Sequence, residues 1–437
     1  MSTREPADLL IEPRWLLPVA PLNTVLEHHA VAISAGRIAA VGPAGQLRAR
    51  FEARERLVRA QHALLPGLVN ADTRACHALL RSVPVAGPRP RWLAEQLAPL
   101  EQRVMSADFV RDGTRLGAAE MLRAGITCFA DLSPFPEEAA RAAAPLRAAI
   151  GLPVGDQPTP WAESATAHLE RAEALWDQYR ADPRVTLYFA PLPRPQLSDA
   201  TLARVRRVAD ELDARIALHL GELPGAAADT GPGVADAAAH SPYGARSLRR
   251  LAAQGLLRPG FTAIGAGALR HEELELLARH GATLVCCPQA ELRLGAAPGP
   301  LPLMGEDRTA LGTDSAALGA LDVLAETRAA ALLSALSGLQ ALRLATLGGA
   351  TALGLASHIG SLEPGKAADL TCLDLGACGG APAADAIVFA ATRSAVSDVW
   401  CAGRAALSGG QLRGFDAEEL GALPQRWAQR LGVEAAA

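Results

Sequence analysis

Residues 64–74 read LLPGLVNADTR, and this stretch decides the fold. A short apolar run ends in polar side chains, and the same arrangement recurs along the chain with helix-length amphipathic segments between the runs. Such a succession predicts repeated βα units around a parallel sheet. Eight units favour a (β/α)8 barrel of the TIM type over an open doubly wound sheet. The expected strands are Leu64–Val69, Ile126–Asp131, Leu146–Leu152, Val185–Ala190, Arg215–Leu220, Phe261–Ile264, Thr283–Cys287 and Thr309–Gly312.

The two ends of the chain lack the alternation of apolar runs and helix-length segments. Residues 8–62 and 359–410 contain short β-like runs with glycines between them, which is typical of strands joined by turns. Because these segments flank the barrel in the sequence, we expect one small β-sandwich domain built from both ends. The predicted divisions are residues 1–62 and 359–410 for this composite domain, 63–358 for the barrel, and 411–437 for a C-terminal helical tail.

Composition excludes several classes of function. The 437 residues carry 42 basic and 46 acidic side chains, a formal net charge of −4, which gives none of the basic surface that nucleic acids require. The seven cysteines are scattered and lack zinc-site spacing, so we expect no disulfides and a reducing cytoplasm. The longest apolar segment, 329–356, is interrupted by Arg343 and predicts buried helices rather than a membrane span.

Functional residues are expected at the carboxyl ends of the strands, where TIM barrels place their active sites. The first strand leads into Asp72 and Arg74, and the fifth leads into His219 with Glu222 close behind it. The eighth leads into Asp314. These five side chains are therefore predicted to converge at the mouth of the barrel.

Three motifs besides residues 64–74 carry a resemblance to a known family. They are GITCF at 125–129, LGTD at 311–314 and GSLEPGKAADL at 360–370. In this order they resemble the amidohydrolase superfamily, in the branch of methylthioadenosine, S-adenosylhomocysteine and related aminopurine deaminases that also includes triazine hydrolases. The resemblance covers nearly the whole chain and implies the barrel with its composite domain. The chemistry must be argued from the site itself.

In that family a divalent metal ion, usually zinc or iron, is held by five positions: an H-x-H pair after the first strand, a His after the fifth, commonly a His after the sixth, and an Asp after the eighth. The resemblance implies that His219 and Asp314 remain of this set. Asp72 and Arg74 replace the H-x-H pair, and Gly265 replaces the sixth-strand His. A bound metal would lower the pKa of its water to about 7 and make it a nucleophile. We therefore expect no metal cofactor, the alternative being one zinc or iron ion held by Asp72, His219 and Asp314.

Other family positions also differ. Glu222 keeps the place of the family's acid, and we interpret it as a vestigial acid/base, whereas Gly221 replaces the His before it. Residues 191–195 read PLPRP where the family has P-H-A-P-Y, and residues 288–294 read PQAELRL where it has P-x-S-N-x-K-L. Changes at the strand ends beside intact scaffold motifs indicate relaxed or redirected selection on the site.

Arg74 decides how the charges of the site balance. A guanidinium is always protonated and only donates hydrogen bonds, so Arg74 cannot ligate a cation. Directed inward, as we expect, it would replace the metal's charge by pairing with Asp314 near Asp72, the alternative being that Arg74 points to solvent. His77 is expected to be a surface or capping residue, the alternative being a substitute ligand beside Asp72. The segment Arg91–Leu93 resembles the family's W-L segment at the substrate entrance.

Three functions remain open at this point. The first is a non-catalytic relative of aminopurine nucleoside deaminases that acts as a binding or partner protein for a small purine-like or other C–N ligand. The second is a hydrolase or deaminase of non-peptide C–N bonds with a remodelled metal site. The third is a metal-free enzyme that uses Glu222 and Arg74. We expect a homodimer by resemblance, an intact paralogue as a further candidate partner, and neither nucleic acid nor a membrane.

Overall fold

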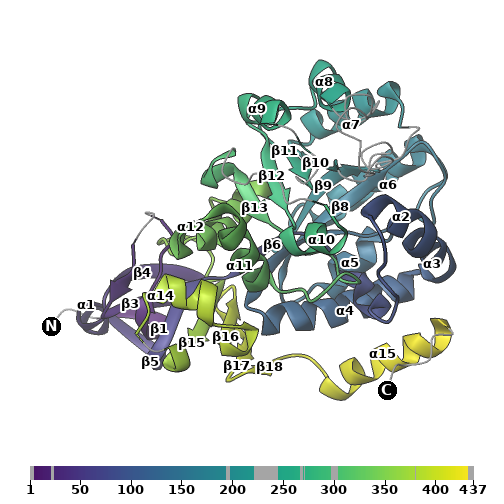
Figure 1. Ribbon diagram of the computed structural model, residues 1–437. Coiled ribbons are helices and arrows are strands. Elements are labelled where there is room, and N and C mark those ends of the chain that lie inside the picture. The colour runs from purple at the N-terminus through teal and green to yellow at the C-terminus, as the bar shows by residue number, and fades with distance from the viewer. Residues whose placement is uncertain are drawn as a thin grey trace.

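The computed structural model describes residues 4–20, 24–192, 197–220, 245–265, 269, 271–296, 304–378 and 380–431. Two sheets organise these residues, one in the barrel and one in a smaller domain beside it (Figure 1). The smaller sheet takes its strands from both ends of the chain. The predicted fold class, a TIM-type barrel with a composite β domain, is therefore confirmed.

The barrel sheet closes through a divided last strand. Each strand is parallel to the next, in chain order. β13 pairs with β12, and β14, which follows after Gly312 and Thr313, pairs with β6. Closure leaves no free sheet edge and brings the first and last strand ends together. The strands are β6 (Leu68–Arg74), β7 (Ile126–Leu132), β8 (Arg147–Val154), β9 (Val185–Pro191), β10 (Arg215–His219), β11 (Phe261–Ile264), β12 (Thr283–Cys286), β13 (Thr309–Leu311) and β14 (Asp314–Ser315).

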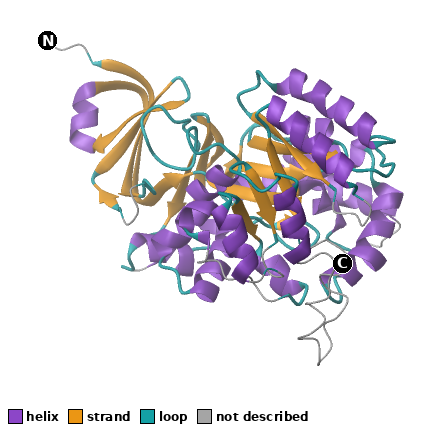
Figure 2. Ribbon diagram, turned by 90° about the horizontal axis from the view of Figure 1, so that it is seen from above, coloured by secondary structure: helices purple, strands orange, loops and turns teal. Residues whose placement is uncertain are grey.

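Helices surround the barrel strands, as Figure 2 shows. The hydroxyl of Ser106 begins α4 by accepting the backbone N–H of Phe109 at 3.2 Å, which satisfies one of the free donors of the first turn. The barrel's helices are α2 (Arg89–Trp92), α3 (Ala98–Val104), α4 (Ala107–Arg123), α5 (Pro136–Ala142), α6 (Ala165–Tyr179), α7 (Asp199–Glu211), α8 (Ala245–Ala253), α9 (His271–Arg279), α10 (Pro288–Arg293), α11 (Val323–Ser334), α12 (Gly338–Arg343) and α13 (Gly349–Ala352). A 3-10 helix η1 (Ala75–Leu80) and a π-helical turn η2 (Leu93–Leu97) lie between β6 and α3.

The composite domain is one mixed sheet with the order β18-β17-β16-β15-β5-β1-β3-β4, and β2 pairs with β1. Its two halves meet where β15 runs antiparallel to the end of β5. The strands are β1 (Glu5–Leu16), β2 (Leu26–Glu27), β3 (His29–Ser34), β4 (Arg37–Pro43), β5 (Phe51–Pro66), β15 (Leu370–Asp374), β16 (Val396–Cys401), β17 (Arg404–Ser408) and β18 (Gln411–Leu412). Helices α1 (Ala44–Arg50) and α14 (Ala383–Asp385) belong to the same chain ends, and α15 (Ala417–Leu431) follows.

The first predicted strand, Leu64–Val69, is wrong in its extent. Leu64 and Leu65 belong to the end of β5 in the composite domain, and the barrel strand begins at Leu68. Gly67 lies between the two strands, where a Cβ atom would come within 2.0 Å of the Thr127 hydroxyl. Only glycine lets the backbone pass this close to β7. The Pro-Gly pair is therefore a crossing point between the two domains.

The apolar residues pack as the predicted pattern requires. The barrel strands are buried along almost their whole length, which is typical of parallel sheets covered by helices. The apolar segment 329–356 forms parts of α11, α12 and α13. Among the described residues, no helix is both long and apolar enough to cross a membrane. All seven cysteines are free thiols.

Candidate functional site

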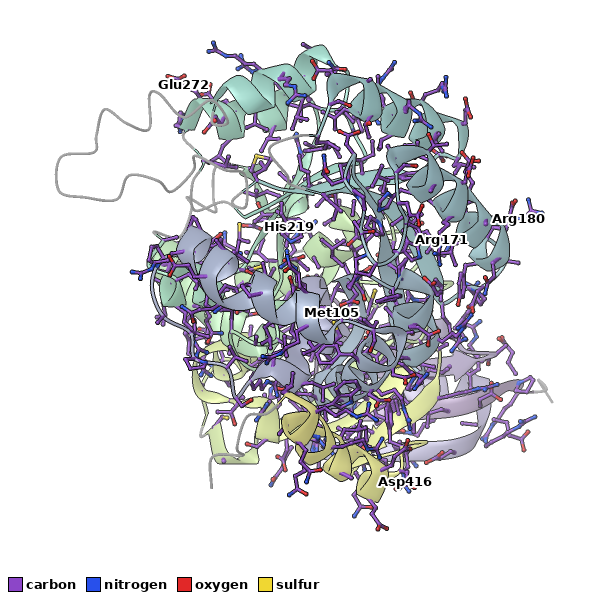
Figure 3. All side chains as sticks on the ribbon, turned by 90° about the vertical axis from the view of Figure 1, so that its right-hand side faces the viewer. Met105, Arg171, Arg180, His219, Glu272 and Asp416 are labelled. Atoms are coloured by element: carbon purple, nitrogen blue, oxygen red, sulfur yellow. The ribbon has the colours of Figure 1, made fainter. Side chains whose placement is uncertain are left out.

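Three strand ends bring the predicted site residues to one place. Asp314 and Ser315 pair in register with Thr73 and Arg74 across β14 and β6. The backbone N–H of Thr313 donates to the carbonyl of Asp72 at 2.9 Å. Figure 3 shows His219, at the end of β10, among the barrel strands. The mouth of the barrel therefore gathers these side chains, as the carboxyl ends of parallel strands do in this fold.

Asp72 and His219 contact each other directly. The His219 Nε2 atom lies 3.1 Å from Asp72 Oδ1, and both side chains are buried. The thiol of Cys287, just after β12, donates to Asp72 Oδ2 at 3.6 Å. From the sequence, Cys287 was expected only as the last residue of the seventh strand, and its contact with Asp72 was missed. Both oxygens of the Asp72 carboxylate are thus engaged by neighbouring side chains.

Asp314 is held by an arginine that sequence analysis did not identify. The Arg89 Nη2 atom donates to Asp314 Oδ2, and the backbone N–H of Ser315 donates to Oδ1 at 2.7 Å. The Arg89 side chain is 15% exposed and that of Asp314 is 4% exposed. Burial alone would raise the pKa of Asp314, but the charges of Arg89, Arg74 and His219 hold it well below its usual range. Asp314 is therefore a carboxylate at neutral pH.

Arg74 is half-buried at the end of β6. Its positive charge lowers the pKa of both Asp314 and Asp131, which places it in the same electrostatic environment. A bidentate bond between Arg74 and Asp314 stays a prediction, because the ion pair found at Asp314 is the one with Arg89. Arg89 was hard to find from sequence because it lies on a short helix between two prolines, outside the strand ends.

A third buried acid adjoins the site. Asp131 is the last residue but one of β7, and its Oδ1 accepts the Ala75 backbone N–H at 2.7 Å. Burial, assisted by the charge of Asp72, raises the pKa of Asp131 to about 7. Asp131 Oδ2 and the hydroxyl of its cross-strand partner Thr73 are buried without a hydrogen-bond partner. The barrel mouth thus contains polar atoms whose hydrogen-bonding capacity is unused.

His77 is not at the surface, so that interpretation is wrong. It is 1% exposed, with Nδ1 2.8 Å from the Ser315 hydroxyl and Nε2 3.1 Å from Glu101 Oε1. The ring is buried because η1 packs beneath α4, where a Cβ on Gly113 would approach the Cys76 carbonyl to 2.3 Å. Both ring nitrogens point to partners other than Asp72. His77 therefore links η1, α3 and the last strand.

Within the described ranges, no three His, Cys, Asp or Glu side chains are arranged to hold a metal ion. Gly265, at the sixth-strand position, has a φ of 86° and donates its N–H to the Val285 carbonyl at 3.0 Å. A histidine there would be strained, because this backbone region favours glycine. Gly221 and Glu222 lie outside the described residues, as do residues 193–195 of the fourth-strand motif.

Comparison with known proteins decides the family. The model of the amidohydrolase family matches residues 63–406, and that of the bacterial imidazolonepropionase-like composite domain matches residues 30–51. The chain belongs to the amidohydrolase family. Its curated relatives include 5-methylthioadenosine/S-adenosylhomocysteine deaminases of Saccharophagus degradans and Teredinibacter turnerae. Both relatives are 34% identical to this chain. The match to the Saccharophagus protein covers 72% of this chain and 70% of the relative, and the match to the Teredinibacter protein covers 76% of this chain and 74% of the relative.

Solved structures with the same fold agree with this assignment. An adenosine deaminase from Xanthomonas campestris with bound zinc is 38% identical, has a TM-score of 0.91, and is matched over 98% of this chain and 100% of its own. A triazine hydrolase variant has a TM-score of 0.82 over 96% of this chain and 99% of its own, and at 21% identity it supports the fold alone. The suspected branch of the amidohydrolase family is thereby confirmed.

Proposed function

We propose that this chain is an amidohydrolase-family protein that binds a small purine-like or other C–N compound without a catalytic metal and without turning it over. The observation that carries the proposal is the buried ion pair between Asp314 and Arg89. In this pair Arg89 binds the carboxylate at the position that holds the metal ion in other members of the family. A guanidinium there supplies positive charge but no Lewis acid.

The charges around Asp314 disfavour a metal ion. Arg89 and Arg74 both act on this carboxylate, and a divalent cation would be repelled by both and would have to displace Arg89 from Oδ2. Loss of one residue that only supports a ligand already lowers metal affinity about 10–100-fold. Here Asp72, Arg74 and Gly265 replace three histidines of the family pattern. We therefore expect no stoichiometric zinc or iron.

Hydrolysis without the metal would lack an activated water. The pKa of free water lies far above that of water bound to a catalytic zinc, which is about 7. Asp314 is a poor base because its pKa lies well below its usual range. The His219 imidazole faces Asp72 through Nε2. These features favour binding over catalysis.

A second candidate is a hydrolase or deaminase with a remodelled metal site. It is favoured by the contact of Asp72 with His219, because imidazole nitrogen and carboxylate oxygen are both zinc ligands. In that case Asp72, His219 and Asp314 would hold the ion once Arg89 had left. A metal-free enzyme that uses Glu222 and Arg74 stays a prediction. We also propose that the protein forms a homodimer or a complex with an intact paralogue, which likewise stays a prediction.

The test combines metal content with turnover. Mass spectrometry of protein purified without added metal should find far less than one zinc or iron ion per chain. Methylthioadenosine, S-adenosylhomocysteine and adenosine should remain unconverted, whereas at least one purine-like compound should raise the melting temperature. One metal ion per chain, or turnover that His219→Ala and Asp314→Ala abolish, would overturn the proposal in favour of the remodelled enzyme.

A further inference from the structure

The partner of Asp314 differs from a metal ion in shape as well as in charge. A guanidinium is a flat cation with directed N–H donors that match the two oxygens of a carboxylate. Asp314 presents its Oδ2 atom to such a donor while Oδ1 is fixed by the N–H of Ser315. The backbone of Asp314 is held with a φ of 55°. The carboxylate is therefore oriented by its own chain, before any partner is considered.

The other polar atoms at the mouth would also suit a flat N–H donor. Asp131 Oδ2 and the Thr73 hydroxyl are buried, lack hydrogen-bond partners, and belong to paired residues of β7 and β6. Both oxygens accept hydrogen bonds. Without Arg89, the buried Asp314 carboxylate would lose the cation that contacts its Oδ2 atom. The seat, by which we mean Asp314 Oδ2 with the nearby Asp131 Oδ2 and Thr73 hydroxyl, would then attract a cation that carries several N–H groups.

Arg89 reaches this seat from outside the barrel sheet. It begins the four-residue helix α2, between Pro88 and Pro90, and the π-helical turn η2 and helix α3 follow. Trp92, at the end of α2, is 1% exposed, and its Nε1 atom has no hydrogen-bond partner. Withdrawal of Arg89 would move a connecting segment and would break no pairing of the barrel strands. Arg89 thus comes from a connecting segment and not from the strand ends that carry Asp314, Asp131 and Thr73.

We propose that Asp314 is a seat for a planar guanidinium or amidinium group, that Arg89 is its built-in occupant, and that the ligand of this protein carries such a group and displaces Arg89. The chemical class is a small guanidino or amidino compound. An adenine ring protonated at N1 presents the same edge of two neighbouring N–H donors. This inference rests on the proposed function in one respect, because it takes Asp314 to be free of a metal ion.

Tethering predicts how the competition behaves. A group attached through a short linker acts at an effective concentration in the millimolar range or above. A free guanidinium must overcome this advantage in the parent protein but not after Arg89 is truncated. We therefore expect Arg89→Ala to bind methylguanidinium roughly 10-fold or more tightly than the parent protein does.

The experiment is chemical rescue followed by thermal unfolding. Arg89→Ala should melt below the parent protein, and millimolar methylguanidinium chloride should restore at least half of the lost melting temperature. Sodium chloride at equal ionic strength should restore none of it. The matched control is Arg91→Ala, since Arg91 is on the same helix but 66% exposed and pairs with the exposed Glu95. This control should show neither the loss nor the rescue.

Rescue should depend on the carboxylate, so Arg89→Ala combined with Asp314→Asn should not respond. If Arg89→Ala does not fold, hydrogen exchange of the parent protein replaces it: methylguanidinium should speed exchange several-fold in residues 89–97. No rescue of the folded variant, equal rescue of Arg91→Ala, or unchanged exchange would overturn the seat. Failure of the proposed function would instead be seen as bound metal or turnover, which these measurements do not involve.

Discussion

Two buried Arg–Asp pairs in this molecule have the same chemistry and serve different ends. Arg147 of β8 donates from Nε to Asp369 Oδ2 at 3.1 Å, with side chains 10% and 3% exposed. The Arg89–Asp314 pair is buried almost as well. Asp369 also accepts the Ala402 N–H at 2.6 Å, and its carbonyl accepts the Gly67 N–H at 2.8 Å. The first pair therefore joins barrel and composite domain.

The difference lies in what holds the arginine. Arg147 is part of a barrel strand whose neighbours fix it on both sides. Arg89 belongs to a four-residue helix that is not part of either sheet. Asp369 lies within the motif GSLEPGKAADL and Asp314 within the motif LGTD, so both acids follow the family pattern, but beside Asp314 the chain departs from it at Asp72 and Arg74. Burial and geometry alone thus do not separate a structural ion pair from one that occupies a functional site.

The largest effect is expected from Arg147→Ala. Removal of one partner leaves Asp369 buried without its counter-charge, which costs about 3–5 kcal/mol. The free energy of unfolding, measured with urea at pH 7, should fall by this amount. The control is Arg184→Ala, because its pair with Asp182 is 47% and 26% exposed, and exposed pairs contribute about 0–1 kcal/mol. If the free energy of unfolding fell equally in the two variants, the Arg147–Asp369 pair would stabilise the protein no more than an exposed surface pair does.

A smaller effect, confined to a pH interval, is expected from Asp131→Asn. The pKa of Asp131 rises from 3.8 to about 7 on folding, so between these values the folded state binds more protons than the unfolded state. Stability must then fall as pH rises through this interval. At about 1.4 kcal/mol per pKa unit, the loss is on the order of 4 kcal/mol above neutrality.

Asparagine keeps an acceptor for the Ala75 N–H and has no charge to bury. Urea unfolding at pH 4 and pH 8 should therefore show a difference between parent and variant that grows with pH in favour of the variant. A difference that does not change with pH would mean that Asp131 is already ionised in the folded protein. The barrel mouth would then be better solvated than its burial indicates.

The smallest effect is expected from chelation. The barrel is stabilised by its apolar core and by the Arg147–Asp369 pair at the domain junction, so we expect a chelator to leave the melting temperature unchanged. The measurement is thermal unfolding with and without chelator, followed by addition of zinc. A marked drop in the melting temperature that one equivalent of zinc reverses would contradict this. It would show that a metal ion bound at the barrel mouth stabilises the fold.

The barrel was predictable because its signals are local. Apolar runs that end in polar residues mark the strands, and the Pro-Gly pair before Leu68 marks a close crossing that steric contact with Thr127 enforces. The division of the last strand into β13 and β14 was not predictable, because it depends on the pairing of β14 with β6, the first barrel strand, which is far away in the sequence. The same long-range contact positions Asp314.

The site was predictable as a set of positions, and its pairings were not. Asp72, His219 and Asp314 follow from where strands end, since parallel strands share one edge. The partner of Asp314 depends on the path of a connecting segment, and the sequence around Arg89 has no periodicity to indicate that path. His77 was misplaced for the same reason, because its burial arises from the packing of η1 beneath α4.

The pairing of β15 with β5 has a consequence for synthesis of the chain. During translation β1 to β5 and then all the barrel strands leave the ribosome before residues 370–374 exist. Until then the end of β5 has an unpaired edge beside buried leucines, and such edges recruit strands from other chains. A nascent chain arrested before Leu370 would therefore be prone to aggregate even with its barrel formed, which makes the last part of translation the interval in which this protein most needs chaperones.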